Sequence, residues 1–191
     1  MKITSVQVAL ARKVSIGGRS ILTAIHKTAV SGPVVVGRLG LEGDEQADLS
    51  VHGGLEKAVY AYPQEHYAFW CTARDQAGVT GFDTPLSPGA MGENLTLQGL
   101  LERDVWVGDV LQFANCTLRV EQPREPCFKF NAVMGFNTAS KVMALNGVCG
   151  FYLSVTSPGI LTAGDSFELV PGPRRISIPE RFDARMFKHM R

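Results

Sequence analysis

Short runs of alternating apolar and polar residues predict a chain built mainly from strands. Near the N-terminus, Val6, Val8 and Leu10 alternate with polar or small residues, which is typical of a strand with one buried face. Further runs are rich in branched and aromatic residues, and most are bounded by Gly, Pro, Asn or Asp, which predicts additional strands. These runs are 23–30, 33–36, 58–62, 105–107, 110–113, 117–120, 151–155 and 167–170.

Two stretches have the pattern of helices. Residues 63–77 open with a proline, which suits a first helical turn, and place large side chains on one side. Residues 137–145 have a polar opening and end before an Asn-Gly pair, a helix stop signal. Between them, residues 78–92 contain Thr, Asp, Ser and two prolines with little periodicity, so we expect a loop there.

Turn signals complete the prediction of the fold. Gly-Asp dipeptides at 108–109 and 164–165 stand in similar settings and predict tight reversals between strands. Glycine and proline supply 30 of the 191 residues, which favours many turns over a helical bundle. We therefore expect a mostly β fold: an antiparallel β-barrel over residues 1–172 with two or three peripheral helices. The composition changes after 171–173, which predicts a short, basic, helical tail over 173–191.

Composition and charge exclude several classes of protein. A 45% hydrophobic chain with a net charge of +1 is not disordered, and it lacks the basic excess of a nucleic-acid-binding protein. Its apolar runs are too short to span a membrane, and no signal peptide is evident, so we expect a cytoplasmic protein. Residues 174–191 hold six Lys/Arg and two Asp/Glu, a net +4. This tail is read either as a solvated helix or as a dock for an acidic partner.

One of the four cysteines stands out. Cys71, Cys116 and Cys149 fit ordinary small buried residues, and no C-x-x-C pair suggests a zinc ribbon or an iron–sulfur cluster. The fourth, Cys127, lies in the segment QPREPCFKF, where two prolines restrict the path of the chain. Flanking cations, Arg124 and Lys129, favour a thiolate, the form that attacks or ligates metal. One thiolate does not hold a metal alone, so other ligands must come from a cofactor.

Three further motifs carry polar groups, and each also has a purely structural interpretation. GLEGDEQADLSVHGG, residues 40–54, ends in His52 and two glycines whose N–H groups suit an anion, or it is a polar loop. Gly-Glu-Asn-Leu, residues 92–95, stands at a strand start, where the Asn often holds its own turn. Thr23 and Lys27 share one face of an expected strand, which suits phosphate or is simply an exposed surface.

In combination, GLEGDEQAD…VHGG…EKAVYAYPQEHYAFW, GENL and QPREPCFKF resemble MOSC-domain proteins of the YiiM subgroup. The resemblance extends over residues 23–170 and rests on the order and spacing of the motifs. It implies a β-barrel that binds the molybdenum cofactor, with Cys127 and the pterin dithiolene holding the metal. It also implies reduction of N-hydroxylated compounds, such as hydroxylaminopurine bases, to their amines. Departures are Leu-Glu before Lys57, Phe130 where Leu is common, and the shortness of the tail.

The resemblance also implies roles for individual residues. Cys127 and His52 are the expected catalytic residues, and His52 is a candidate proton donor because the histidine side chain can titrate near neutral pH. Asp44 and Glu93 are weaker proton donors, while N–H and cationic groups suit the anionic pterin. The expected cofactor-binding residues are Thr23, Lys27, Asp44, Gly53, Gly54, Glu93, Asn94, Arg124 and Lys129.

The chain has no GxGxxG fingerprint, so we expect electrons to come from a separate flavoprotein reductase. A small N-hydroxylated substrate is the other expected partner, and a homodimer is left open. One alternative function is a sulfur carrier with a persulfide on Cys127, and another is a non-catalytic cofactor-binding module. Cofactor sulfurases of this family carry a separate pyridoxal-phosphate domain that 191 residues cannot also contain, so pyridoxal phosphate is not expected.

Overall fold

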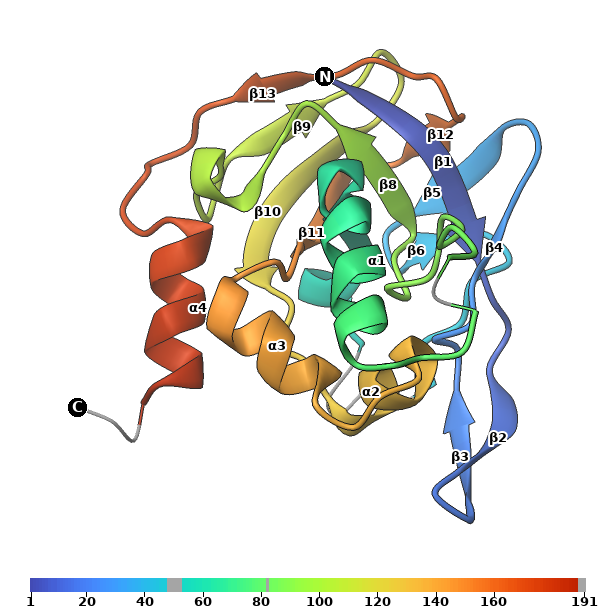
Figure 1. Cartoon of the computed structure of the whole chain (residues 1–191). Helices are drawn as coiled ribbons and strands as arrows, with labels where there is room; N and C mark the ends of the chain where they lie inside the picture. The colour runs from blue at the N-terminus through green and yellow to red at the C-terminus, as the bar shows by residue number, and fades with distance from the viewer. Residues whose placement is uncertain (48–52, 82, 189–191) are drawn as a thin grey trace.

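The computed structural model describes residues 1–47, 53–81 and 83–188 and is mainly β, as the sequence predicts. One large sheet has the strand order β13-β9-β10-β11-β7-β8-β1-β4. A second sheet has the order β12-β5-β6, and β2 pairs with β3 in a hairpin that projects from the body (Figure 1). The strands of the large sheet are β1 (Lys2–Val8), β4 (Thr28–Ala29), β7 (Val59–Pro63), β8 (Leu95–Gln98), β9 (Val110–Gln112), β10 (Thr117–Pro123), β11 (Phe151–Ser157) and β13 (Glu168–Val170). The others are β2 (Arg12–Ile16), β3 (Arg19–Thr23), β5 (Val34–Gly37), β6 (Gly40–Leu41) and β12 (Gly159–Leu161).

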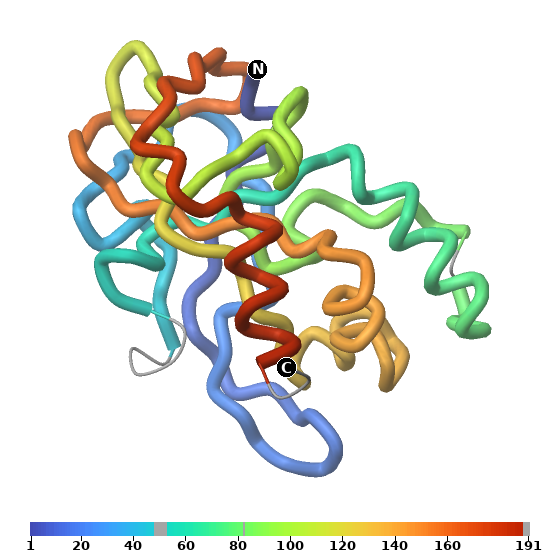
Figure 2. Tube along the Cα trace, turned by 90° about the vertical axis from the view of Figure 1, so that its left-hand side faces the viewer, coloured from blue at the N-terminus to red at the C-terminus, as the bar shows by residue number. Residues whose placement is uncertain are grey.

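The large sheet curls strongly but does not form a continuous closed barrel. Figures 1 and 2 show the start of the chain beside the segment that leads into β13. Lys2 and Ser166 form an isolated antiparallel bridge there, and the Ile3 N–H donates to the Asp165 carbonyl at 2.9 Å. Within the described residues no ladder joins β1 to β13. The mostly β prediction is confirmed, whereas the closed barrel is not.

One strand pair departs from the predicted antiparallel arrangement. β7 and β8 pair in parallel, with Ala61 opposite Leu95. Parallel neighbours need a long crossover connection, and the segment between these strands supplies it, including α1 (Tyr67–Gln76). The crossover returns the chain so that β8 runs in the same direction as β7 and lies between β7 and β1.

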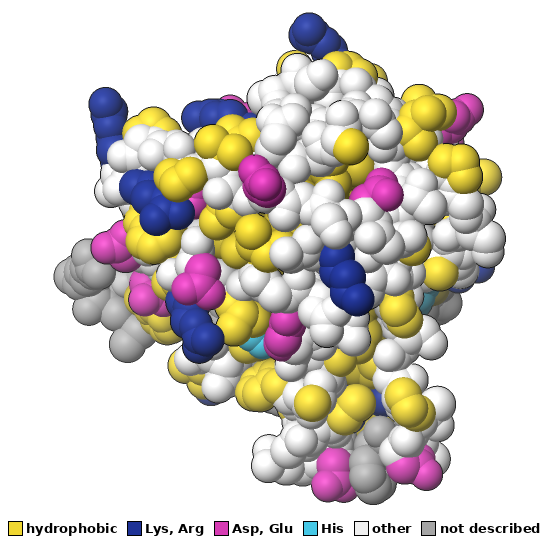
Figure 3. Space-filling view, turned by 90° about the horizontal axis from the view of Figure 1, so that it is seen from above, with side chains coloured by type: hydrophobic (Ala, Val, Ile, Leu, Met, Phe, Trp, Pro, Cys, Tyr) yellow, Lys and Arg dark blue, Asp and Glu magenta, His cyan; other side chains and the backbone are white. Residues whose placement is uncertain are grey.

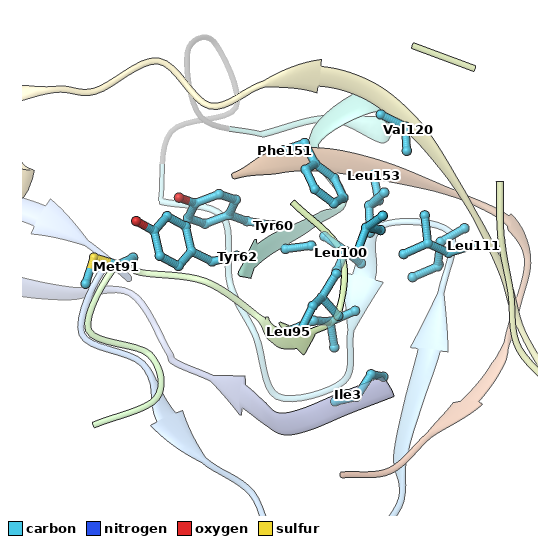
Figure 4. Packing of buried hydrophobic residues seen from close by; sticks show 14 of the residues in the cluster. Ile3, Tyr60, Tyr62, Met91, Leu95, Leu100, Leu111, Val120, Phe151 and Leu153 are labelled. Atoms are coloured by element: carbon cyan, nitrogen blue, oxygen red, sulfur yellow. The ribbon is translucent and has the colours of Figure 1, made fainter. Parts of the chain in front are cut away.

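The core fills the inside of the curled sheet. Figure 4 shows aromatic and aliphatic side chains from several strands meeting there, among them Leu95 and Phe151. The polar ends of buried aromatics find partners: the Tyr62 hydroxyl donates to the Val148 carbonyl at 3.0 Å and accepts from Trp70 Nε1 at 2.6 Å. Burial of these large side chains is the main source of stability.

The helices match the sequence in part. α1, preceded by a 3₁₀ turn at Gln64–His66, and α3 (Ala139–Asn146) were both predicted, and α3 ends at Gly147 in the left-handed conformation. α2 (Phe128–Met134) was not predicted, because seven residues are too few for a clear helical period. The tail forms α4 (Ile178–Met186), which packs on β10; the domain boundary at 173 stays a prediction. Among the described helices, none is long and apolar enough to cross a membrane.

Two of the expected strands do not form continuous strands in the structure. The expected strand 23–30 is interrupted, since β3 ends at Thr23 and only Thr28–Ala29 pairs again. Residues 24–27 leave the sheet, and the Thr23 hydroxyl accepts the Ile25 N–H at 3.3 Å. The run 105–107 forms only a single bridge, between Trp106 and Ser177. Branched and apolar residues in these two runs therefore did not signal a continuous ladder.

The face drawn in Figure 3 carries acidic and basic side chains intermixed with polar and apolar atoms. On that face the cations do not gather into one basic patch. This distribution agrees with the near-neutral net charge of +1.

Candidate functional site

A pocket forms where six segments of the chain meet. They are the end of β3 with the residues after it, the loop after β6, the start of β7, the loop before β8, the segment after β10 and the start of β11. The pocket brings together seven of the residues predicted from sequence. These are Thr23, Lys27, Asp44, Asn94, Arg124, Cys127 and Lys129.

The other predicted residues lie elsewhere. Gly53, Gly54 and Glu93 are not part of the pocket lining. The Gly54 N–H donates to Gln46 Oε1 at 2.8 Å, and Gln46 lines the pocket. Gly54 therefore contacts a lining residue without lining the pocket itself. His52 lies outside the described residues, and its expected role as a proton donor stays a prediction.

Cys127 is half-buried in the pocket wall, directly before α2. Its backbone is extended, with φ −133° and ψ 168°, and the two upstream prolines restrict the approach of the chain. Arg124 comes from the same short segment and lines the same pocket. A guanidinium near a thiol favours the thiolate, as the sequence analysis expects.

Arg124 is a buried cation, with 5% of its surface exposed. Its Nη1 donates to Met143 Sδ at 3.3 Å, and its guanidinium lies 5.6 Å from the Tyr60 ring centre and 4.9 Å from that of Phe130. Burial lowers the pKa of Arg124, but nearby tyrosines and Cys127 outweigh it and the pKa is raised. Among the described residues no carboxylate forms an ion pair with Arg124. A buried charge in this state is costly, and an anionic ligand would compensate it.

Lys27 and Asp44 form a buried ion pair on another wall of the pocket. Burial lowers the pKa of Lys27, and the adjacent Asp44 carboxylate opposes that shift. Asp44 also accepts the Ala9 N–H at 2.8 Å and the Asn94 side-chain amide at 2.8 Å. With these donors around it, the Asp44 carboxylate fixes Lys27 and is poorly suited to donate a proton itself.

Asn94 joins the two strands that flank β8. Its Oδ1 accepts the Tyr60 N–H at 3.0 Å, and its Nδ2 donates to the Gln7 carbonyl at 3.3 Å as well as to Asp44. The side chain therefore links β7, β1 and the pocket wall. This role differs from the local turn that usually explains an Asn at a strand start.

Glu93 is fully buried behind the pocket. Its carboxylate accepts the N–H groups of Gly89 (2.8 Å) and Met91 (3.0 Å) and the hydroxyls of Tyr67 and Thr96. Burial raises the pKa of Glu93, and these hydrogen bonds oppose the shift. Glu93 thus organises the loop before β8 and makes no contact with the pocket interior.

That loop packs closely on the segment that carries Lys27. At Gly92, φ is +79°, and an added Cβ would lie 2.9 Å from Ile25 Cγ1. At Gly89 a Cβ would lie 2.7 Å from the Lys27 carbonyl oxygen. Both glycines are needed for this close approach. The Gly-Glu-Asn motif therefore shapes the pocket through packing and hydrogen bonds together.

Sequence reasoning missed several pocket residues. Lys57, Tyr60 and Tyr152 line the pocket, and Lys57 Nζ lies 5.8 Å from the centre of the Tyr152 ring. A lysine directly before a buried strand was the available signal for Lys57. Among the described residues the lining contains four cations and two acids, and one of those acids is the partner of Lys27. Cations on several sides of the pocket suit an anionic ligand.

Comparisons with known proteins agree with this geometry. The MOSC domain model matches residues 48–168. Protein YiiM of Escherichia coli K12 is 38% identical over 159 residues, 83% of this chain and 68% of that protein. The uncharacterized protein YflK of Bacillus subtilis is 39% identical over 162 residues, 84% of this chain and 70% of that protein. A protein of Gibberella moniliformis named as a reductase is 34% identical over 163 residues. The matched region is 85% of this chain and 28% of that protein.

Solved structures of YiiM proteins share the fold. YiiM from Geobacillus stearothermophilus matches with a TM-score of 0.77 and 31% identity, over 100% of this chain and 86% of that one. YiiM from Escherichia coli matches with a TM-score of 0.73 and 27% identity, over 96% of this chain and 77% of that one.

The MOSC match covers most of the curled sheet and most of the pocket lining, so the class of protein is MOSC-type. The chain belongs to the MOSC domain family, and its similarity to the YiiM proteins extends over most of its length.

Proposed function

We propose that this protein is a molybdenum-cofactor-dependent reductase of N-hydroxylated compounds, hydroxylaminopurine bases among them. One observation carries the proposal: Cys127 shares a pocket with a buried Arg124 that has no carboxylate partner among the described residues. Family membership supports it, because MOSC domains are generally associated with this cofactor. The relative named as a reductase supports an oxidoreductase activity.

The donor groups of the pocket fit the cofactor. A pterin cofactor carries an anionic phosphate and a metal that accepts a thiolate ligand. Cys127 would supply the thiolate, and Arg124 with Lys57 and Lys129 would offset the negative charge. Lys27 is already paired with Asp44, so its contribution to anion binding would be smaller.

The overall reaction consumes two electrons and two protons: R–NHOH + 2e⁻ + 2H⁺ → R–NH₂ + H₂O. When bound, the cofactor supplies the electrons and accepts the oxygen. The chain binds the substrate and provides protons. Lys27 holds a proton at Nζ on the pocket wall, and its lowered pKa favours release of that proton. His52 is a second proposed donor.

A separate flavoprotein reductase supplies the electrons in this proposal. A thiolate at Cys127 requires a reducing compartment, so the proposal places the protein in the cytoplasm. A homodimer is a further proposal.

The test is turnover of 6-N-hydroxylaminopurine with a chemical reductant, using protein made in a host that synthesises the cofactor. We expect the wild type to form the amine and Cys127→Ala to lose activity. Cys71→Ala is the matched control, because Cys71 is half-buried on α1 outside the pocket.

Other results would reject the proposal. Equal turnover by Cys127→Ala would contradict the role of the thiol. A persulfide on Cys127 in protein without molybdenum would favour the sulfur carrier. Retained molybdenum without turnover would favour a cofactor-binding module.

A further inference from the structure

We propose that the C-terminal helix α4 positions the segment that carries Cys127, and that Arg185 is the positioning residue. Arg185 Nη1 donates to Gln122 Oε1 at 2.9 Å and to Glu125 Oε1 at 2.5 Å. These two acceptors lie on either side of Arg124 and a few residues before Cys127. The functional importance of this contact rests on the proposed role of Cys127, but its structural test does not.

α4 is firmly attached to the body, which makes it a suitable support. Ile178 and Phe182 are buried, with 0% and 1% of their surfaces exposed. The Ile178 N–H donates to the Val105 carbonyl at 2.9 Å. Ser177 and Glu180 form a capping box at the start of the helix. In Figure 1 the helix stands beside the end of β10, with which it makes contact.

The cysteine segment needs support from side chains. Pro123 and Pro126 have no N–H groups to donate. The Arg124 N–H reaches the Gly150 carbonyl only at a long 3.4 Å. Gln122 is buried and Glu125 is exposed, so one guanidinium of Arg185 fastens both the inner and the outer side of this segment. A planar fork of donors suits such a double contact better than an ammonium does.

The contact between Arg185 and Glu125 also gives the basic tail a structural role. Arg174 stacks on the Trp106 ring at 4.4 Å and lies 3.5 Å from Asp109. With Arg185 on Glu125, two of the tail's cations thus fasten the tail to the body. The positive charge that suggested a dock for an acidic partner has an internal structural use.

The test is hydrogen exchange of the amides in 122–130, measured on the cofactor-free full chain. We expect Arg185→Gln to exchange roughly two- to fivefold faster there, the range for a partly exposed ion pair. Glu125→Gln removes the partner without touching α4 and should have a similar effect. The charge swap Arg185→Glu with Glu125→Arg should restore slow exchange, because Gln122 can turn its amide to donate to the new carboxylate.

Arg103→Gln is the control, since the Arg103 side chain is 76% exposed and its ion pair among the described residues is with its neighbour Asp104 at 3.7 Å. A second readout is alkylation of Cys127 by iodoacetamide, which should be faster in both single variants. Unchanged exchange at 122–130 in Arg185→Gln and Glu125→Gln would overturn the proposal. Because no cofactor is present, that result would leave the proposed function standing.

Discussion

At Arg124, stability and ligand binding make opposite demands on one side chain. The guanidinium is buried between aromatic rings and has no acidic partner among the described residues. Replacing a buried charge by an apolar residue of similar length often stabilises a protein. Arg124→Met is therefore expected to raise the free energy of unfolding of the cofactor-free chain by about 1–2 kcal/mol in urea denaturation.

The same variant should bind less cofactor when it is produced in a competent host. Arg103→Met, at an exposed position, should change neither quantity. Lower stability with full cofactor content in Arg124→Met would contradict this account of the pocket.

The burial of Glu93 predicts that the stability of the protein depends on pH. Burial raises its pKa above the ordinary value of 4.5, so the folded protein holds this proton more tightly than the unfolded chain. The resulting stability is present at low pH and is lost as pH rises from 4.5 through the raised folded-state pKa. Glu93→Gln cannot titrate. The free energy of unfolding of the wild type should therefore fall relative to that of Glu93→Gln across this window.

Urea denaturation at a series of pH values checks this expectation. Glu65→Gln, at an exposed carboxylate that accepts the Gly99 N–H, serves as the control. Parallel pH curves for the wild type and Glu93→Gln would show that Glu93 does not titrate differently on folding.

Individual site residues were predictable where reactive and charged residues are close together in the sequence. Cys127 could be identified because prolines and cations surround it within nine residues, 122–130. Glu93 and Asn94 are adjacent in sequence, yet one lies behind the pocket and the other lines it. Sequence reasoning could not separate their roles. Tyr152 follows a strand pattern typical of core, so nothing local distinguishes it as a pocket residue.

At the scale of elements, the two Gly-Asp turns have the same hydrogen bonds. Asp109 Oδ2 accepts the Trp106 N–H at 3.0 Å, and Asp165 Oδ2 accepts the Thr162 N–H at 2.8 Å. In both turns the aspartate N–H also donates to the carbonyl three residues earlier. The short sequence echo thus reflects a shared turn geometry.

The two turns differ in what else they support. Asp109 is fully buried, accepts the Gly172 N–H at 2.7 Å and lies near Arg174, whereas Asp165 is half-buried. Asp109→Ala should therefore cost about 3–5 kcal/mol, as for the breaking of a buried charged contact. Asp165→Ala should cost about 1 kcal/mol. Denaturant midpoints test this difference, and equal losses would contradict the proposed role of Asp109 in fastening the tail.

Most elements followed from local patterns, and the exceptions depend on distant contacts. Alternation and turn residues predicted most strands, an opening proline and apolar periodicity located α1, and a stop signal located α3. The expected strand 23–30 is interrupted where the loop around Gly92 packs closely on Ile25, a contact between segments far apart in sequence. The parallel pairing of β7 with β8 likewise depends on which strands meet across the crossover, and no local period records that.

At the scale of the molecule, the curled sheet gathers six segments of the chain at one pocket. Their residues come from positions as distant as Thr23 and Tyr152. Order and spacing of motifs were visible in the sequence, but their convergence depends on the fold. The proposed function depends on that convergence, because Lys27 and Lys57 reach the ligand of Cys127 and Arg124 only if these segments share a cavity.

The most direct test of the central claim is elemental analysis of the purified chain from a host that makes the molybdenum cofactor. We expect near-stoichiometric molybdenum in the wild type and in Cys71→Ala, and its loss in Cys127→Ala with the fold retained. Absence of molybdenum from the wild type, or equal content in Cys127→Ala, would contradict the assignment of Cys127 as the protein's metal ligand.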